Sequence, residues 1–280
     1  MGTKLVWVFI VVSGIIGVIW LLVFHYSETI FFRPVKTDTI PSEWTDRYLF
    51  EPSPIQYREV TLDAFYLKQN ESEHVVLIAH SGFGNLFQQR SLCEAFADLG
   101  VSVFIFDYRG YGRSSDTTIN EASMTDDVLR AYGKLMQLGW PQDSVIFYGQ
   151  DIGASLLAKI AQNKGFAAWI GENTVFRLSD VMNDIVRKGM VSSQFDVESD
   201  LINIAPKTFF IQNSQHPYLS STAVASFVER YSSFDRYCLF TEAGIRSPVE
   251  NHRESWKQCM KQFLEKVPPP VPKPIKKKRS

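Results

Sequence analysis

The most constraining feature of the sequence is an alternation between short apolar runs and longer amphipathic stretches that end at glycine. Val75–Ala79 (VVLIA) and Val101–Phe106 (VSVFIF) are continuous apolar runs, as expected of strands buried on both faces. Between them, Phe87–Leu99 has the apolar spacing of a helix and stops at Gly100. Strands that alternate with helices predict a parallel sheet covered by helices on both faces.

The same alternation continues toward the C-terminus. The pattern predicts further strands at Ser144–Tyr148, Phe166–Ile170, Thr208–Gln212 and Arg236–Thr241. It predicts helices at Met124–Leu138, Ile152–Asn163, Leu178–Lys188, Thr222–Arg230 and His252–Lys266. Gln56–Leu67 has the pattern of an antiparallel hairpin that precedes the parallel strands. We therefore expect one α/β domain over residues 56–266, preceded by a leading segment over residues 25–55.

Composition and charge support a globular domain and exclude several classes of partner. The 280 residues are 45% hydrophobic and 21% charged, which excludes a disordered or collagen-like chain. Residues 1–24 carry +1 and residues 266–280 carry +6 of a net charge of −1, so residues 25–265 carry −8. An acidic body of this kind argues against a nucleic-acid partner. The three cysteines lie far apart without a C-x-x-C pair, so we expect neither a disulfide framework nor a cysteine zinc site.

Residues 5–24 form an uncharged apolar run that follows a short flank at residues 1–4. Its length matches the roughly 20 helical residues that cross a bilayer. The run is longer than a typical signal-peptide core and no A-x-A cleavage site follows, so we favour an uncleaved signal anchor and a single-pass membrane protein over a secretory signal. Lys4 on one side is balanced by Arg33 and Lys36 on the other, which leaves the side of the membrane open.

The C-terminal residues 267–280 read as an extended tail rich in proline and lysine. If the tail lies in the cytoplasm, its basic cluster could contact anionic lipid. That cluster consists of Lys276, Lys277, Lys278 and Arg279. The sequence also contains one N-glycosylation sequon, Asn70-Glu71-Ser72.

Three loops carry the resemblance to a known family. Because sites in parallel sheets form at the carboxyl ends of strands, the residues after each predicted strand are informative. These loops are His80–Asn85 (HSGFGN), Asp107–Ser115 (DYRGYGRSS) and Gly149–Ala154 (GQDIGA). Their order and setting resemble the α/β-hydrolase superfamily, most closely its membrane-anchored abhydrolase-domain and bud-emergence subgroup, which is similar to serine aminopeptidases. Ile30–Pro34 and Glu172–Thr174 fit the same subgroup. The resemblance implies a mostly parallel sheet with helices on both faces and a short lid, which we expect at about residues 175–207.

The three catalytic positions that this resemblance implies are all substituted. The nucleophile elbow of the family reads G-x-S-x-G, and here Asp151 takes the place of the serine between Gly149 and Gly153. The position of the catalytic acid falls on His216, and the position of the catalytic histidine falls on Ile245. Isoleucine cannot transfer a proton, so the relay that activates a serine is not intact.

Asp151 admits two interpretations. Haloalkane dehalogenases and epoxide hydrolases of this superfamily use an elbow aspartate as a nucleophile, but they need a histidine to activate water. His252, or His216, could supply that base only if the fold brings it to Asp151. Asp151 could instead simply cap the helix that starts at Ile152. Gly82 and Ile152 could still offer the backbone N–H groups of an oxyanion hole.

The sequence thus supports two hypotheses about function. In the first, the protein is a catalytically degenerate α/β-hydrolase, a pseudoenzyme that binds an apolar or lipid ligand or acts as a scaffold. In the second, it is a divergent hydrolase of ester, amide, epoxide or halide substrates that uses Asp151 with His252 or His216. Neither hypothesis requires a cofactor or a metal ion. An imidazole within about 2.6–3.2 Å of Asp151 would favour the second.

Overall fold

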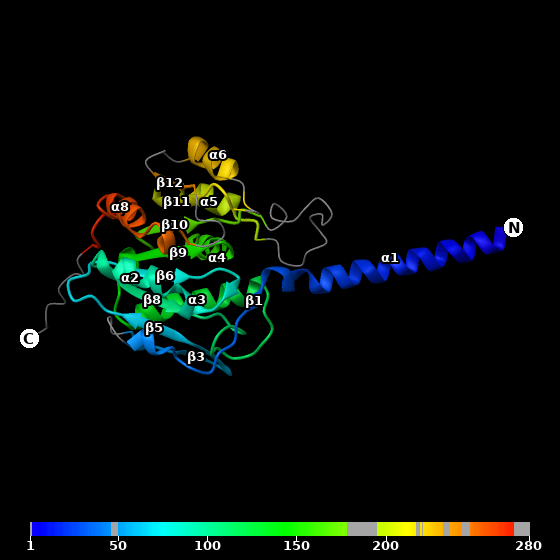
Figure 1. The fold of residues 1–280 in the computed structure, drawn as a ribbon, viewed down its shortest axis with the longest axis horizontal. Helices are drawn as coiled ribbons and strands as arrows, with labels where there is room; N and C mark the ends of the chain where they lie inside the picture. The colour runs from blue at the N-terminus through cyan, green and yellow to red at the C-terminus, as the bar shows by residue number, and fades with distance from the viewer. Residues whose placement is uncertain are drawn as a thin grey trace, which may run out of the picture.

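The domain is built around one eight-stranded sheet (Figure 1). The computed structural model describes residues 2–45, 50–177, 195–216, 219, 221–231, 236–241 and 247–271. Along the sheet the strand order is β12-β11-β10-β9-β6-β8-β5-β2. The strands are β2 (Glu51–Pro52), β5 (Ala64–Leu67), β6 (Val75–Ala79), β8 (Ser102–Phe106), β9 (Val145–Gln150), β10 (Ala168–Glu172), β11 (Thr208–Asn213) and β12 (Tyr237–Phe240). The six strands from β12 to β8 pair in parallel, whereas β5 and β2 are antiparallel.

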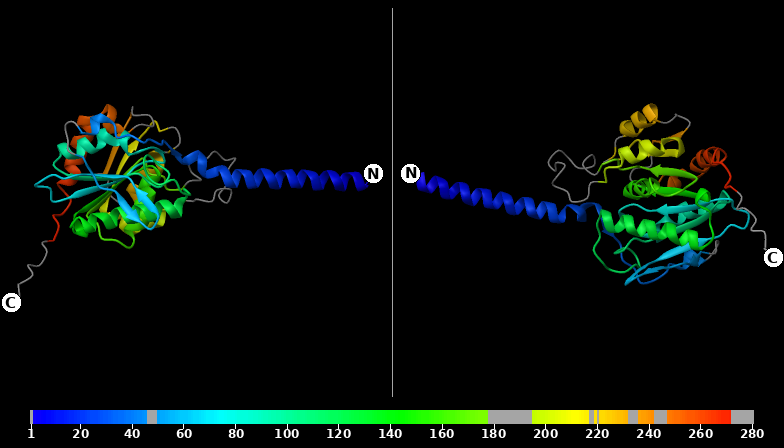
Figure 2. Two further views of the ribbon diagram at one scale, coloured as in Figure 1. Left: turned by 90° about the horizontal axis from the view of Figure 1, so that it is seen from below. Right: turned by 180° about the vertical axis from the view of Figure 1, so that it is seen from behind.

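Helices cover both faces of the sheet, as Figures 1 and 2 show. Alternate residues of each strand point to opposite faces, so Leu77 joins one buried apolar cluster and Val76 the other. The first cluster holds side chains of α3 (Glu121–Gln137), α4 (Ile152–Ala161), α5 (Glu198–Ile204) and α6 (Ser221–Tyr231). The second holds side chains of α2 (Arg90–Asp98), α7 (Pro248–Asn251) and α8 (Arg253–Leu264). The central strands are therefore buried on both sides, which explains their continuous apolar sequences.

The predicted parallel sheet and its helices are confirmed, with most element ends within a few residues. The predicted hairpin at Gln56–Leu67 is confirmed as the pair β3 (Ile55–Tyr57) and β4 (Val60–Leu62), although the following β5 joins the main sheet. The predicted helix at Phe87–Leu99 begins as a 3-10 turn at Leu86–Gln89. The predicted helix at Leu178–Lys188 lies outside the described residues.

Helix α1 (Gly2–Phe31) extends away from the domain in each view of Figures 1 and 2. Its side chains are described for residues 6–22, and these are exposed. Within the part of the chain that the structure describes, no helix combines the length and apolarity needed to cross a bilayer. The membrane span predicted at residues 5–24 is therefore not confirmed by the structure.

A short backbone strap joins the end of α1 to the first loop of the candidate site. Strand β1 (Arg33–Pro34) pairs in parallel with β7 (Phe83–Gly84), just beyond the carboxyl end of β6. The N–H of Arg33 donates to the carbonyl of Gly82 at 2.8 Å, and the N–H of Val35 donates to that of Gly84 at 2.9 Å. Phe32, just before the strap, is buried. The chain therefore leaves α1 at the edge of the sheet where its parallel strands end.

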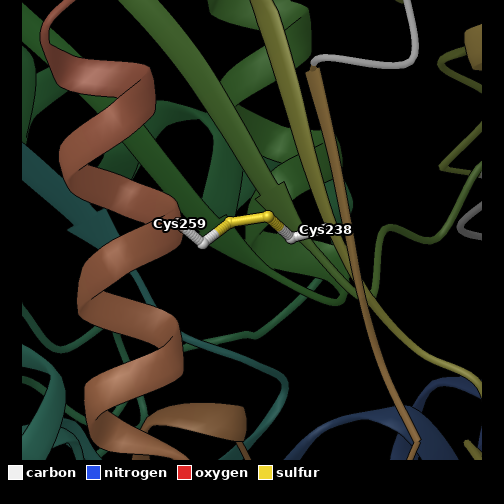
Figure 3. Close-up of a disulfide and its surroundings, with 2 residues drawn as sticks. All are labelled: Cys238 and Cys259. Carbon is white, nitrogen blue, oxygen red and sulfur yellow. A yellow bond between two sulfur atoms is a disulfide. The ribbon is translucent and has the colours of Figure 1, made fainter.

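A disulfide joins Cys238 of β12 to Cys259 of α8 (Figure 3). The Cα atoms lie 6.7 Å apart, within the range that a disulfide can bridge. The third cysteine, Cys93, is free and buried. The expectation that the cysteines form no disulfide is thus wrong, because packing of the last helix on the last strand brings together two residues that are 21 positions apart. Spacing along the chain does not reveal such a pair.

Candidate functional site: the elbow at Asp151

The turn between β9 and α4 has the conformation of a strained elbow. Asp151 adopts φ +50° and ψ −115°, a conformation that costs a non-glycine residue about 1–3 kcal/mol. A Cβ atom on Gly149 would lie 2.2 Å from Cα of Ala154, and one on Gly153 would lie 2.1 Å from the carbonyl oxygen of Ala79. The two glycines therefore let α4 start directly against the central strands. The elbow predicted from the spacing of Gly149, Asp151 and Gly153 is present.

Asp151 does not cap helix α4. An N-cap residue normally has extended backbone angles, and its side chain accepts a hydrogen bond from the second or third helical N–H. Asp151 has a positive φ, and its side chain makes no capping hydrogen bond. The capping interpretation of Asp151 is therefore wrong, because the elbow turns the side chain away from the helix N–H groups. Its carboxyl group is held at the carboxyl end of β9 without serving the helix.

The carboxyl group of Asp151 is poorly solvated and next to another acid. Burial, followed by the charge of Glu172, raises the pKa of Asp151 well above its ordinary value of 3.8. Among the described residues, the hydrogen bonds of Asp151 involve its backbone groups: the N–H donates to the carbonyl of Glu172 at 2.9 Å, and the carbonyl accepts from the N–H of Val175 at 3.4 Å. A carboxyl group in this setting tends to hold its proton. A protonated carboxyl group donates hydrogen bonds well but attacks carbon poorly.

Glu172, which sequence reasoning did not assign a role at the site, anchors a buried polar network behind the elbow. Its carboxylate accepts hydrogen bonds from the hydroxyl of Tyr148, from Nε2 of Gln150 at 3.1 Å and from Oγ of Ser247 at 2.9 Å. Burial raises the pKa of Glu172, and these three donors oppose that shift. Since Ser247 immediately precedes α7, the network ties β9 and β10 to the C-terminal helices. In the sequence, the feature that could have indicated a role for Glu172 is its position at the end of a buried strand.

The candidate histidines do not contact Asp151. Burial lowers the pKa of His216 to about 4, so its imidazole is neutral near pH 7 and cannot replace a catalytic carboxylate. The ring of His252 lies 6.1 Å from that of Phe240, and its Nε2 atom is buried without a hydrogen-bond partner. Across the described ranges, neither imidazole forms a hydrogen bond with the carboxyl group of Asp151. Ile245 lies outside the described residues.

Hydrogen bonds from the strap and from the second loop hold the first loop of the site, His80–Asn85. The carbonyl of Gly82 accepts from Arg33 in the strap and from the hydroxyl of Tyr111 at 2.9 Å. His80 is fully buried, and its Nδ1 donates to the carbonyl of Ser81 at 2.7 Å. Among the described contacts, the N–H groups of Gly82 and Ile152 have no protein acceptor. The N–H groups of Gly82 and Ile152 therefore stay the predicted oxyanion donors, and the buried, hydrogen-bonded imidazole of His80 has a structural role.

The second loop, DYRGYGRSS, has a structural role, because its side chains hold neighbouring segments in place. Asp107 is fully buried, and its Oδ1 accepts from the N–H of Leu86 at 2.7 Å. The guanidinium of Arg109 binds the carboxylate of Asp127 in α3 through both Nε and Nη2. A Cβ atom on Gly112 would lie 1.9 Å from Oδ2 of Asp107, so this turn also requires glycine. The motif therefore fixes the loops around the elbow.

The two described ends of the predicted lid meet beside the elbow. The N–H of Val197 donates to the carbonyl of Phe176 at 3.0 Å, and Arg177 forms ion pairs with Asp196 and Glu198. The ring of Phe195 packs on that of Phe32 with centroids 6.1 Å apart, so the lid base also contacts the residue that follows α1. Residues 178–194 of the predicted lid lie outside the described part of the chain.

A pocket of about 230 Å³ lies next to this lid base rather than at the elbow. It is lined by Phe176, Glu198, Ala223, Ser226, Phe227, Arg230 and Tyr231. Where the structure describes the chain, no three His, Cys, Asp or Glu side chains converge as a metal site would need. The elbow therefore offers the carboxyl group of Asp151 and the backbone N–H groups of Gly82 and Ile152.

Comparison of the sequence with known proteins shows which family and which relatives it is similar to. A family model described as "Serine aminopeptidase, S33" matches residues 70–207. Protein bem46 of Schizosaccharomyces pombe is 27% identical over 188 residues, which cover 62% of this chain and 62% of bem46. Protein YfhR of Escherichia coli O157:H7 is 28% identical over 138 residues, 47% of this chain and 48% of YfhR. The match thus spans less than two thirds of the length of these relatives.

Solved structures share the fold at low sequence identity. The Pyrococcus furiosus esterase Pf2001 superposes with a TM-score of 0.67 at 16% identity, over 85% of this chain and 98% of the esterase. XC6422 of Xanthomonas campestris, described as an α/β serine hydrolase without a lid, has a TM-score of 0.57 at 14% identity, over 84% of this chain and all of XC6422. The chain therefore has the fold of the α/β-hydrolases, and residues 70–207 are similar to the serine aminopeptidase family.

Because Gly153 packs closely against the end of β6, we expect a methyl group added at this position to destabilise the folded protein. We expect Gly153→Ala to lower the free energy of unfolding by about 1–3 kcal/mol or more, because the new methyl group meets backbone that cannot move aside. Gly133→Ala in α3 is the matched control, since a Cβ atom there has no neighbour within 4 Å and should add about 0.5–1 kcal/mol. Urea unfolding measures both. Equal effects of the two substitutions would contradict the packing argument.

The raised pKa of Asp151 predicts a pH-dependent contribution to stability. Because the folded protein holds a proton that the unfolded chain releases near pH 3.8, this contribution is present at low pH and is lost as the pH rises through the folded-state pKa. Replacing Asp151 with Asn removes the titrating group and keeps its shape. We therefore expect Asp151→Asn to gain stability relative to the wild type as the pH rises above about 4.

Asp63 provides the control for this measurement. Burial raises the pKa of Asp63 to about 6, so the difference between the wild type and Asp63→Asn should change only between about pH 4 and pH 7. The Asp151→Asn difference should change in the same direction as the pH rises above about 4. A flat difference across the whole range would mean that the Asp151 carboxyl group is ordinarily ionised in the folded protein.

Proposed function

We propose that this chain is a catalytically degenerate α/β-hydrolase that binds an apolar ligand at the elbow rather than turning it over. The observation that carries the proposal is the carboxyl group of Asp151, which occupies the nucleophile position without an imidazole among its described contacts. Its raised pKa favours the neutral acid, which can donate a hydrogen bond to a ligand oxygen. The backbone N–H groups of Gly82 and Ile152 would bind the same oxygen.

The surroundings of the elbow support an apolar ligand. Tyr108 and Tyr111 are fully buried beside His80, with ring centroids 4.7 and 5.4 Å from its imidazole. The contact between Phe195 and Phe32 adds aromatic surface at the lid base. The strap brings the end of α1 to the same edge of the sheet, so a membrane-bound α1 would hold the elbow near lipid. An acyl chain from a lipid has the shape and polarity for such a ligand.

A second candidate, a divergent hydrolase, is favoured by one observation. The Nε2 atom of His252 is buried and has no hydrogen-bond partner among the described residues, so this imidazole could serve as a base if it were brought to Asp151. In that mechanism the ionised carboxylate of Asp151 attacks an electrophilic carbon of the substrate, and the bond from that carbon to the halide, epoxide oxygen or ester alkoxide breaks as the leaving group departs. Water activated by His252 then hydrolyses the ester on Asp151, or the mixed anhydride that an ester substrate gives, and restores the carboxylate. The raised pKa of Asp151 works against the ionised form that the first step needs.

Ester hydrolysis distinguishes the two candidates. We expect the wild type and Asp151→Ser to hydrolyse a p-nitrophenyl ester no faster than background, because a serine without a base is not activated. The triple substitution Asp151→Ser, His216→Asp and Ile245→His restores the missing relay and should raise the rate by at least about 100-fold. Wild-type turnover that disappears in His252→Ala would refute degeneracy and establish the second candidate. A large gain by Asp151→Ser alone would also refute it.

We further propose that residues 5–24 attach the protein to a membrane. The run is uncharged, and the described side chains of α1 expose a large apolar surface, which supports insertion. We expect the full chain to stay in the membrane fraction after carbonate washing and a chain lacking residues 2–31 to be released. Gly14→Arg should weaken insertion, because a charge at mid-bilayer costs about 2.5–3.5 kcal/mol, and Gly14→Leu should not. Release of the full chain by carbonate would contradict the proposal.

A further inference from the structure

Two features far apart on the domain point to the same chemical environment. One is the disulfide between Cys238 and Cys259, and the other is the sequon Asn70-Glu71-Ser72. Neither belongs to the elbow or to the proposed ligand site. Together they identify a covalent modification site and the side of the membrane on which the domain folds.

The disulfide indicates an oxidising compartment. Disulfides that hold a fold together form and persist in the secretory pathway, the periplasm and outside the cell, and are rare where glutathione keeps thiols reduced. Here the bond links the outermost strand of the sheet to the last helix (Figure 3). Cys93 is fully buried, and burial raises the pKa of its thiol, so it cannot readily attack the disulfide. The pairing is therefore a fixed structural bond in a protein with one inert thiol.

The sequon lies where a glycan could be attached without disturbing the fold. Asn70 and Glu71 form an exposed turn between β5 and β6. Within the described contacts, the side-chain amide of Asn70 has no hydrogen-bond partner in the protein. The turn itself is ordered by the N–H of Ser72, which donates to the carbonyl of Gln69 at 3.3 Å. Asn70 is the only residue in the 280-residue sequence that meets the N-x-S/T rule.

The position of Asn70 also keeps a glycan away from the site. Asn70 precedes the amino end of β6, whereas the strap and the elbow lie at the carboxyl end of the same strand. Five residues of strand separate the two ends by about 16 Å. A bulky sugar at Asn70 would therefore project from the edge of the domain opposite α1 and the elbow.

We propose that Asn70 is N-glycosylated and that the domain folds on the lumenal side of a secretory-pathway membrane. The donor is an oligosaccharide joined through a diphosphate to a lipid. The amide nitrogen of Asn70 forms a bond to C1 of the first sugar and releases one proton. The bond between C1 and the diphosphate oxygen breaks, and the diphosphate leaves on its lipid carrier. This proposal does not depend on whether the elbow binds a ligand or turns it over.

The test uses the full chain expressed in eukaryotic cells. Treatment with peptide-N-glycosidase should increase the gel mobility of the wild type and convert Asn70 to aspartate, which mass spectrometry of the peptide detects. Asn70→Gln should run at the mobility of the treated protein. Ser72→Thr keeps the sequon and should keep the glycan. A wild type that the enzyme does not change would overturn the proposal.

A control variant separates the compartment from the choice of site. Asp116 is exposed, where it pairs with Lys36, and it is followed by Thr117 and Thr118, so Asp116→Asn creates a second sequon. We expect two glycans in Asp116→Asn and one in the double variant Asp116→Asn, Asn70→Gln. A glycan on the new sequon alone would show that the domain is lumenal and would overturn Asn70 as the site. No glycan on either sequon would overturn the compartment as well.

Discussion

The structure depends on one close approach, between the first turn of α4 and the end of the central strand β6. At Gly153 there is no room for a methyl group, because the carbonyl oxygens of Ala79 and His80 already lie where it would be. This contact fixes the elbow, the first loop of the site and β9 as one unit. The strap adds α1 to that unit through Gly82 and Gly84. A movement of α1 relative to the domain would therefore act first on the loop that carries the predicted oxyanion donors.

The electrostatics of the site follow from the same packing. Asp151 directly follows β9 and Glu172 ends the neighbouring strand β10, and burial raises the pKa of both carboxyl groups. Glu172 has three hydrogen-bond donors, whereas among the described residues no donor reaches the side chain of Asp151. When two nearby acids compete for one charge, the acid whose charged form accepts more hydrogen bonds ionises first. The proton consequently belongs on Asp151, the residue that stands at the nucleophile position.

The fold was predictable because its signals are local. Continuous apolar runs such as Val75–Ala79 mark buried strands, and glycines at 149 and 153 mark an elbow whatever residue stands between them. The pairing of β1 with β7, the role of Glu172 and the disulfide were not predictable in this way. Each depends on residues that only the assembled sheet brings together, such as Arg33 and Phe83, which are 50 positions apart. The error about Asp151 as a helix cap has the same origin, since residue type favours a cap and only backbone angles exclude it.

The strained backbone conformation of Asp151 helps to distinguish a structural role of this residue from a ligand-binding role. A residue kept only to start a helix would adopt ordinary angles and satisfy a helix N–H, and Asp151 does neither. It combines a strained backbone with a carboxyl group whose pKa is raised by burial and by the charge of Glu172. Strain of this kind persists where the surrounding structure over-determines the conformation, here through Gly149, Gly153 and the network at Glu172. A bound ligand oxygen would give the Asp151 hydroxyl the acceptor that the described protein lacks, which makes ligand binding the simplest role for this side chain.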